Sequence, residues 1–162
     1  LIEGCIAYNN GFLTDGTVGR GDKNGFKLGG EGIHVPHIIR KSIAFGNGAD
    51  GFTSNSNPGV ILLNNIAYNN GRNLNLSTYP NIVADFTLKR FVSYQKEKKA
   101  KDIYPEELNS DCNYLFNGSV SQNKSGVRLT DDNFPVTTFA RDAEGNIIYG
   151  DFLKFINAPL KE

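Results

Sequence analysis

The sequence predicts an all-β solenoid, a parallel β-helix, and two observations carry this prediction. The first is an apolar segment ending in Asn and Gly that occurs three times, at 5–11, 42–48 and 65–71. The copies begin 37 and 23 residues apart, and periods of this length are typical of stacked coils. The second is that no amphipathic helical window separates the copies. Leucine-rich repeats have similar periods, but their leucine pattern is absent.

The corners of the coils are expected at the Asn-Gly ends of the copies, because Asn and Gly tolerate left-handed backbone conformations. We expect Asn9, Asn47 and Asn69 to stack as an amide ladder. The 37-residue step is one coil plus an insertion, which we place at Leu13 to Lys23. This insertion is polar and Gly-rich, and loops of this kind carry functional sites on rigid scaffolds.

A lysine between two apolar residues marks the next strand, in Asn24-Gly-Phe-Lys-Leu-Gly-Gly30. Side chains alternate between the two faces of a strand, so Lys27 should point outward. Similar segments follow at 50–54 and 71–76, which extends this outward strip to Thr53 and Asn75. The residues expected inside are Phe26, Leu28, Phe52, Leu74 and Leu76. Further interior rows are expected from Ile6, Ile43, Ile66, Tyr8, Phe45 and Tyr68.

Composition limits the classes of protein. The 162 residues have a net charge of zero, so nothing favours nucleic acid or an anionic membrane as a partner. No apolar run approaches the ~20 residues of a membrane span.

Cys5 and Cys112 are expected as buried thiols in strands, and the sequence leaves a disulfide between them open. The chain begins inside a repeat, so we expect a fragment of a longer protein with an uncapped first coil.

The second half of the chain is less regular. We expect one or two strands within 85–94 and a charged excursion from the coil at 95–111, with a short helix opening at Pro105. Repeat-like sequence resumes at 112–118, and 134–162 is a C-terminal tail expected to pack on the solenoid. The whole chain, 1–162, is interpreted as a single β-helix domain.

Several of these segments together resemble family 9 polysaccharide lyases. They are Asn24-Gly-Phe-Lys-Leu-Gly-Gly30, the stretch from His37 to Asn47, Gly51-Phe52, Asn55-Ser-Asn-Pro-Gly59, and, in the tail, 141–145 and 151–154. The resemblance is strongest over 24–75. It implies a right-handed, pectate lyase-like β-helix that acts on an acidic polysaccharide. It also implies a secreted or periplasmic bacterial enzyme, and we expect a monomer when the protein is full length.

The resemblance implies β-elimination on a uronic-acid polymer, in which a base removes the proton at C5 and the glycosidic oxygen leaves C4. The motif lysine of the family corresponds to Lys27, which we expect to be this base. A divalent cation on the uronate carboxylate would stabilise the developing charge. The family's calcium is held by aspartates upstream of that lysine, so Ca²⁺ ligands are expected before residue 1 and none within this chain. Asp15 and Asp22 lie in no paired-aspartate motif.

Candidate substrate-binding residues are His37, Arg40, Asn55 and Asn57. An arginine can pair with a uronate carboxylate through two parallel hydrogen bonds. Each candidate also has a structural interpretation, with His37 at a strand edge, Arg40 as a lone surface charge and the asparagines as turn residues.

Two other classes of function remain open. A non-catalytic carbohydrate-binding or adhesin-like β-helix would use the same polar strips without needing Lys27. A glycoside hydrolase needs two carboxylates flanking the scissile bond, and only Asp50 is close to the predicted strip.

Overall fold

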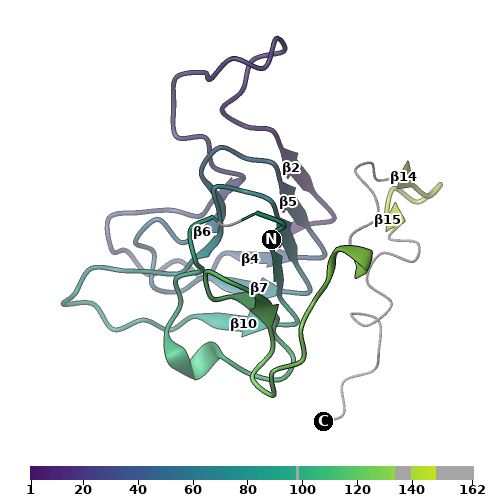
Figure 1. The fold of residues 1–162 in the computed structure, drawn as a ribbon. Coiled ribbons are helices and arrows are strands. Elements are labelled where there is room, and N and C mark those ends of the chain that lie inside the picture. The colour runs from purple at the N-terminus through teal and green to yellow at the C-terminus, as the bar shows by residue number, and fades with distance from the viewer. Residues whose placement is uncertain (98, 134–139, 149–162) are drawn as a thin grey trace.

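The computed structural model describes residues 1–97, 99–133 and 140–148. The chain winds through three parallel sheets, and each coil adds one strand to each sheet (Figure 1). The first sheet contains β1 (Ile2–Glu3), β4 (Ile38–Arg40), β7 (Ile61–Leu63) and β10 (Thr87–Lys89). The second contains β2 (Ile6–Tyr8), β5 (Ile43–Phe45), β8 (Ile66–Tyr68) and β11 (Val92–Tyr94). The third contains β3 (Phe26–Lys27), β6 (Asp50–Thr53) and β9 (Arg72–Asn75).

The register confirms the repeat that the sequence predicts. Ile6 pairs with Ile43 and Ile43 with Ile66, which are the predicted steps of 37 and 23 residues. The longer step contains an excursion between β2 and β3. It stands out from the coils as the purple loop of Figure 1 and is closed by an antiparallel bridge between Phe12 and Val18.

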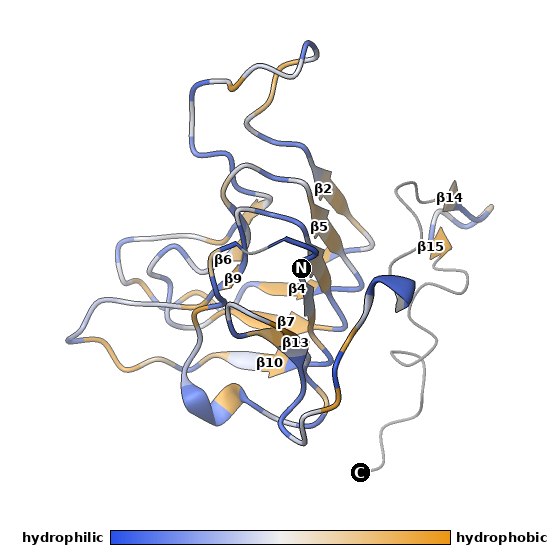
Figure 2. Ribbon diagram, viewed as in Figure 1, coloured by the Kyte–Doolittle hydropathy of each residue, from blue (hydrophilic) through white to orange (hydrophobic). Residues whose placement is uncertain are grey.

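The interior of the solenoid is apolar and largely closed to solvent. Phe52, Leu62 and Leu74 are completely buried there, and the ring of Phe26 stacks on Phe52 at 4.9 Å. Figure 2 shows apolar residues concentrated in the strands and polar residues in the turns. The predicted interior positions Leu28 and Leu76 are also buried.

The second sheet differs from the prediction, because its Ile and aromatic residues do not face the interior. Its central alanines, Ala44 and Ala67, belong to the same cluster as Phe52. Adjacent side chains point to opposite faces, so the flanking residues lie on the outer face of the sheet. They form a separate cluster there, with Ile43, Ile66, Tyr68, Val92, Tyr94 and Ile147 at its centre. The predicted stacking does occur, with Tyr8 on Phe45 at 5.2 Å and Phe45 on Tyr68 at 5.0 Å.

The amide ladder is one residue away from the predicted position in two of the three coils. Asn10, Asn47 and Asn70 form it: Oδ1 of Asn47 accepts the N–H of Asn10, and Oδ1 of Asn70 accepts the N–H of Asn47, both at 3.0 Å. Asn9 and Asn69 instead occupy the left-handed corner, with φ of 53° and 52°. The ladder hydrogen-bonds backbone groups that the turn leaves without partners in a strand.

The coils become irregular beyond β11. The segment 95–111 contains the short 3₁₀ helix η1 (Glu106–Leu108), which follows Pro105 as expected. Ile103 still pairs with Asn75 as an isolated parallel bridge, so this segment adds a fourth layer to the third sheet. The hairpin of β12 (Leu115–Phe116) and β13 (Ser121–Gln122) follows.

The C-terminal part contains the 3₁₀ helix η2 (Asp131–Asn133) and the hairpin of β14 (Ala140–Arg141) and β15 (Ile147–Ile148). Ile147 packs on the outer cluster of the second sheet. The rest of the tail expected to cover the solenoid, 134–139 and 149–162, lies outside the described residues.

Both cysteines are free and only partly buried. Cys5 precedes β2 and Cys112 lies in a turn, so the expectation of buried thiols within strands is wrong for both. No helix among the described residues is long and apolar enough to span a membrane.

Candidate functional site

The outer face of the third sheet carries a strip of polar side chains, here called the lysine strip. Lys27 of β3 pairs in register with Thr53 of β6, which pairs with Asn75 of β9. The neighbouring positions Phe52 and Leu74 are fully buried, so the strip faces outward, as the sequence predicts. Asp50 and Arg72 pair at the other end of the same strands.

The glycine before Phe26 is required by close packing between coils. A Cβ added to Gly25 would lie 2.5 Å from the carbonyl oxygen of Gly51 and 2.9 Å from Nδ2 of Asn47. The N–H of Gly25 bonds to the carbonyl of Asp50, and the amide of Asn24 accepts the N–H of Asp50. The Asn-Gly pair therefore anchors β3 on β6 and fixes the direction of the Lys27 side chain.

Lys27 is half exposed, and its ammonium group contacts the carboxylate of Asp22 in the excursion. This hydrogen bond and the charge of Lys27 lower the pKa of Asp22 below its usual value. The sequence did not predict this contact, because Asp22 lies in an irregular loop where spacing does not determine where the side chain points. The excursion thus contributes an acidic group next to the strip.

Asp50 and Arg72 form a hydrogen-bonded group with Asn75 of the lysine strip. Oδ1 of Asp50 lies 3.3 Å from Nη1 of Arg72, and Oδ2 accepts a 2.8 Å hydrogen bond from Nδ2 of Asn75. The carbonyl of Lys101 accepts a bond from Nε of Arg72 at 3.1 Å. Three coils therefore contribute to one polar surface on the same side as Lys27.

The two candidate asparagines behave differently. Asn55 follows the strip residue Thr53 and is partly exposed, and its amide donates to the carbonyl of Gly29. Asn57 is completely buried. Its Nδ2 donates to the carbonyls of Leu28 and Val35, and its Oδ1 accepts the N–H groups of Val35 and Gly59. A buried and saturated amide has no surface for a sugar, so its structure supports the turn interpretation.

The other two candidates do not lie on the lysine strip. Arg40 belongs to β4 of the first sheet, where Nη2 pairs with the carboxylate of Glu3 at 2.8 Å. His37 is exposed just before β4. The sequence alone did not show that these two residues lie on a different face of the solenoid from Lys27. Each coil passes through three sheets in turn, and the family-like segments continue from one sheet into the next.

The described residues contain no group of three or more His, Cys, Asp and Glu that could hold a metal ion. Asp22 and Asp50 are the acids of the strip, and each is already paired with a basic residue. The acidic residues of this part of the chain therefore do not fit a calcium site.

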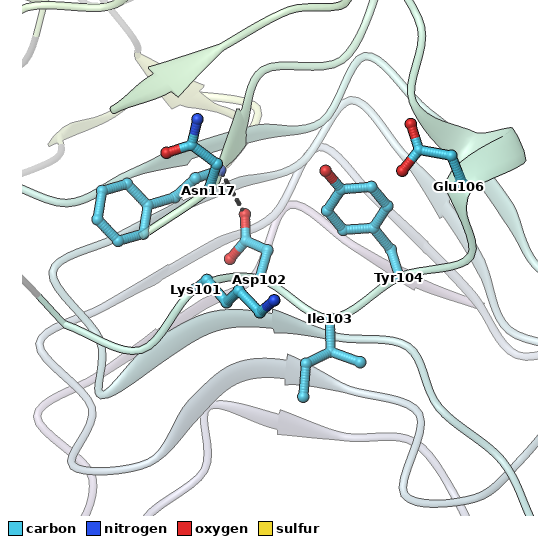
Figure 3. A pocket seen from close by; sticks show the side chains of 7 residues that line it. Lys101, Asp102, Ile103, Tyr104, Glu106 and Asn117 are labelled. Atoms are coloured by element: carbon cyan, nitrogen blue, oxygen red, sulfur yellow. Dashed lines mark hydrogen bonds between the residues drawn. The ribbon is translucent and has the colours of Figure 1, made fainter. Parts of the chain in front are cut away.

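A cavity of about 310 Å³ lies near the far end of the described coils, between 101–104 and β12 (Figure 3). Tyr104 and Glu106 lie together at one side of it. The Asp102 carboxylate is buried and accepts the N–H groups of Leu74 and Phe116. Burial raises the pKa of Asp102 to about 7, although these hydrogen bonds and Arg72 oppose the shift. This arrangement ties the last layer to the solenoid.

The coil order, the parallel register and the closed apolar interior define the protein as a right-handed parallel β-helix with a polar strip on one outer face. The chain belongs to the Pel9A-like right-handed β-helix family, whose model matches residues 1–95.

Relatives support this assignment. The chain is 59% identical over 135 residues to a pectate lyase L of Thermoclostridium stercorarium. The matched region covers 83% of this chain and 11% of that protein. It is 37% identical over 157 residues to a pectate lyase L of Paenibacillus polymyxa, covering 94% of this chain and 34% of the relative. The crystal structure of pectate lyase Pel9A superposes with a TM-score of 0.59 at 26% identity, over 94% of this chain and 37% of that one. The chain thus spans about a third or less of these relatives.

Proposed function

We propose that this chain is the part of a polysaccharide lyase that carries the proton-abstracting base, and that the protein cleaves a pectate-like uronic-acid polymer by β-elimination. The observation that supports this most is the place of Lys27. In a chain that belongs to the Pel9A-like family, it is the basic residue of the family-like motif and stands on the outward strip of the third sheet.

The proposed reaction needs one base and one leaving group. The neutral amine of Lys27 takes the proton from C5 of a uronate, and the electron pair left behind forms the double bond between C4 and C5. The bond from C4 to the glycosidic oxygen breaks, and that oxygen leaves on the neighbouring sugar, where it takes a proton from water and becomes a hydroxyl group. The product carries an unsaturated uronate at its new non-reducing end.

The contact with Asp22 sets a condition on this role. An amine that accepts a proton cannot at the same moment be the ammonium partner of a carboxylate, so the Lys27–Asp22 pair must open before proton transfer. Both side chains are substantially exposed to solvent, and exposed ion pairs of this kind contribute little to stability. The polymer can therefore displace the contact at little cost.

Calcium is part of the proposal for the longer protein. A divalent cation on the uronate carboxylate would stabilise the charge that develops as C5 loses its proton. Since the described residues do not fit such a site, its ligands would come from other residues of the protein, as the family resemblance implies.

Of the four candidate substrate contacts, we retain Asn55 beside the lysine strip. The Asn57 side chain is buried and hydrogen-bonded to the backbone, and Arg40 belongs to another sheet. A pectate-like substrate also favours a secreted or periplasmic enzyme that acts on an extracellular polymer.

The test uses the full-length protein with Lys27→Ala and Lys27→Arg. Both variants should lose about 10²–10⁴-fold in turnover, since arginine keeps the charge but not the ability to act as a base near neutral pH. Turnover is measured as the absorbance of the unsaturated product with calcium present. Binding of the polymer should fall much less, and the melting temperature should not change.

A matched control is Lys89→Ala, an exposed lysine at the end of β10 in the first sheet, which should leave turnover unchanged. Near-normal turnover by Lys27→Ala would refute the assignment of the base. A parent protein that binds the polymer but releases no unsaturated product would instead be a non-catalytic carbohydrate-binding β-helix.

A further inference from the structure

Arg72 is a basic residue beside the lysine strip that the proposed reaction does not use. It opens β9, in register with Asp50 of β6. The carboxylate of Asp50 lies between Arg72 and Asn75 and bonds to both. Because Asn75 is in register with Thr53 and Thr53 with Lys27, these contacts place the guanidinium group on the face that carries Lys27.

The contacts of this group engage both oxygens of Asp50 and leave N–H donors of Arg72 without a partner among the described residues. Each oxygen of Asp50 accepts one hydrogen bond, from Nη1 of Arg72 and from Nδ2 of Asn75. A guanidinium group has five N–H donors. Arg72 uses Nη1 for Asp50 and Nε for the carbonyl of Lys101, and among the described residues Nη2 has no hydrogen-bond partner.

The position of Arg72 is fixed although its side chain reaches solvent. The side chain is 28% exposed and that of Asp50 is 16% exposed. Two anchored nitrogens restrict the rotamers of the side chain, so the remaining donors are already oriented when a ligand arrives. Planar and oriented donors of this kind fit a carboxylate, which accepts two parallel N–H bonds from arginine.

We propose that Arg72 is a specificity-determining residue that binds the free carboxylate of a uronate away from the bond that breaks. This inference rests on the proposed function, because it takes the uronic-acid polymer along the lysine strip as the ligand. Arg72 lies two strands from Lys27, roughly 10 Å across the sheet, and three positions earlier along its strand. At that separation it cannot touch the C5 proton, so it acts on affinity and on the choice of polymer.

A methyl ester at the same sugar would lose this interaction. The ester removes the negative charge and leaves one strong acceptor oxygen, so the ion pair with two parallel hydrogen bonds reduces to a single hydrogen bond from the arginine to an uncharged carbonyl. Arg72 therefore favours de-esterified polymer over methyl-esterified polymer.

The experiment compares Arg72→Gln, which keeps a donor but removes the charge, with the unchanged full-length protein. We expect KM for fully de-esterified polymer to rise about ten-fold, a change equivalent to about 1.4 kcal/mol, and kcat to stay within about two-fold. The ratio of kcat/KM for de-esterified over methyl-esterified polymer should fall by a similar factor. Equal losses on both polymers, or a loss in kcat alone, would overturn the proposal.

Arg90→Gln is the matched control. Arg90 is also partly exposed and lies in the turn after β10, with Nη1 3.4 Å from Oδ1 of Asn64. It is not on the lysine strip, so the substitution should change neither KM nor the preference between polymers. A KM for Arg90→Gln that rises as much as that of Arg72→Gln would mean that arginines act through overall charge, which contradicts the proposal.

A second readout separates this inference from the proposed function. Calorimetric binding of de-esterified oligouronide is compared between Lys27→Ala and Lys27→Ala/Arg72→Gln, where no turnover is needed. About ten-fold weaker binding by the double variant supports the role of Arg72 even if the parent is not a lyase. Equal binding overturns that role even if the parent is one.

If Arg72→Gln lowers the melting temperature because Asp50 loses its partner, Arg72→Lys is decisive. Lysine keeps the charge near Asp50 but not the planar fork. The preference for de-esterified polymer should still weaken in this variant, whereas wild-type preference would overturn the proposal.

Discussion

Asp102 shows how one buried side chain can make the stability of the solenoid depend on pH. It occupies the row of the third sheet that also contains Phe52 and Leu74, one layer further along, as the pairing of Ile103 with Asn75 shows. Ser93 and the N–H groups of Leu74 and Phe116 donate to it, and Arg72 is the nearby positive charge, but burial is the largest influence on its pKa.

The pKa of Asp102 is raised from 3.8 to about 7 by folding. As the pH rises through this interval, the unfolded chain releases the proton first and the folded chain retains it. The free energy of unfolding should therefore fall between about pH 4 and pH 7, by at most about 1.4 kcal/mol per pH unit, and change little above. Denaturant unfolding at several pH values measures this slope.

Asp102→Asn should flatten the slope, whatever its effect on absolute stability. The exposed acids Glu3, Asp15, Asp22 and Asp142 have lowered pKa values, so their contribution is lost only as the pH falls below about 4. A slope that persists in the variant between about pH 4 and pH 7 would show that another group causes it.

At the level of residues, the sequence predicted which face Lys27 occupies but not which groups surround it. Alternation along a strand determines the side on which a residue lies, and the spacing of the repeated segments predicted which residues are in register. The contact with Asp22 and the burial of Asn57 depend on irregular turns, where no period applies. The same limit applies to Arg72, whose contacts with Asp50 and Lys101 join residues of different coils.

At the level of elements, the existence and spacing of the strands were predictable, and the inward face of the second sheet was not. Its Ile-Ala-aromatic triplets are apolar at every position, so they show no alternation between an apolar and a polar face. Strands buried on both faces have this property. Small residues at the interior positions, Ala44 and Ala67, are the signal that distinguishes the two faces.

Two phenylalanines test this assignment of faces. Phe52 is completely buried inside the solenoid, where its ring packs against Phe26 and Phe91. Phe45 lies on the outer face and is partly exposed. Phe52→Ala should lower the free energy of unfolding by about 3–5 kcal/mol, and Phe45→Ala should cost clearly less, because its ring is not fully buried. Urea unfolding of both variants measures the difference, and equal losses would contradict the outer position of Phe45.

For the whole molecule, the described coils form one solenoid with additions on two sides. The excursion between β2 and β3 projects at one end and brings Asp22 to the lysine strip (Figure 1). The hairpin of β14 and β15 lies against the outer face of the second sheet through Ile147. The sequence predicted an insertion and a covering tail, but not which face the tail would cover, because the contact joins residues far apart in the chain.

The hairpin offers a test of this arrangement with a control in the adjacent residue. Ile147 is 7% exposed and Ile148 is 49% exposed, although both belong to β15. Ile147→Asp places a carboxylate in the apolar outer cluster of the second sheet, which is costly without a partner, so the hairpin should detach from the sheet. Trypsin should then cleave after Arg141 about ten-fold faster or more, since the opened state is the one that the protease cuts. Binding of a hydrophobic dye should also increase as the outer cluster becomes exposed.

Ile148→Asp should leave both measurements unchanged, because that side chain already faces solvent. Equal cleavage of the two variants would show that the hairpin does not depend on Ile147 for its place on the solenoid.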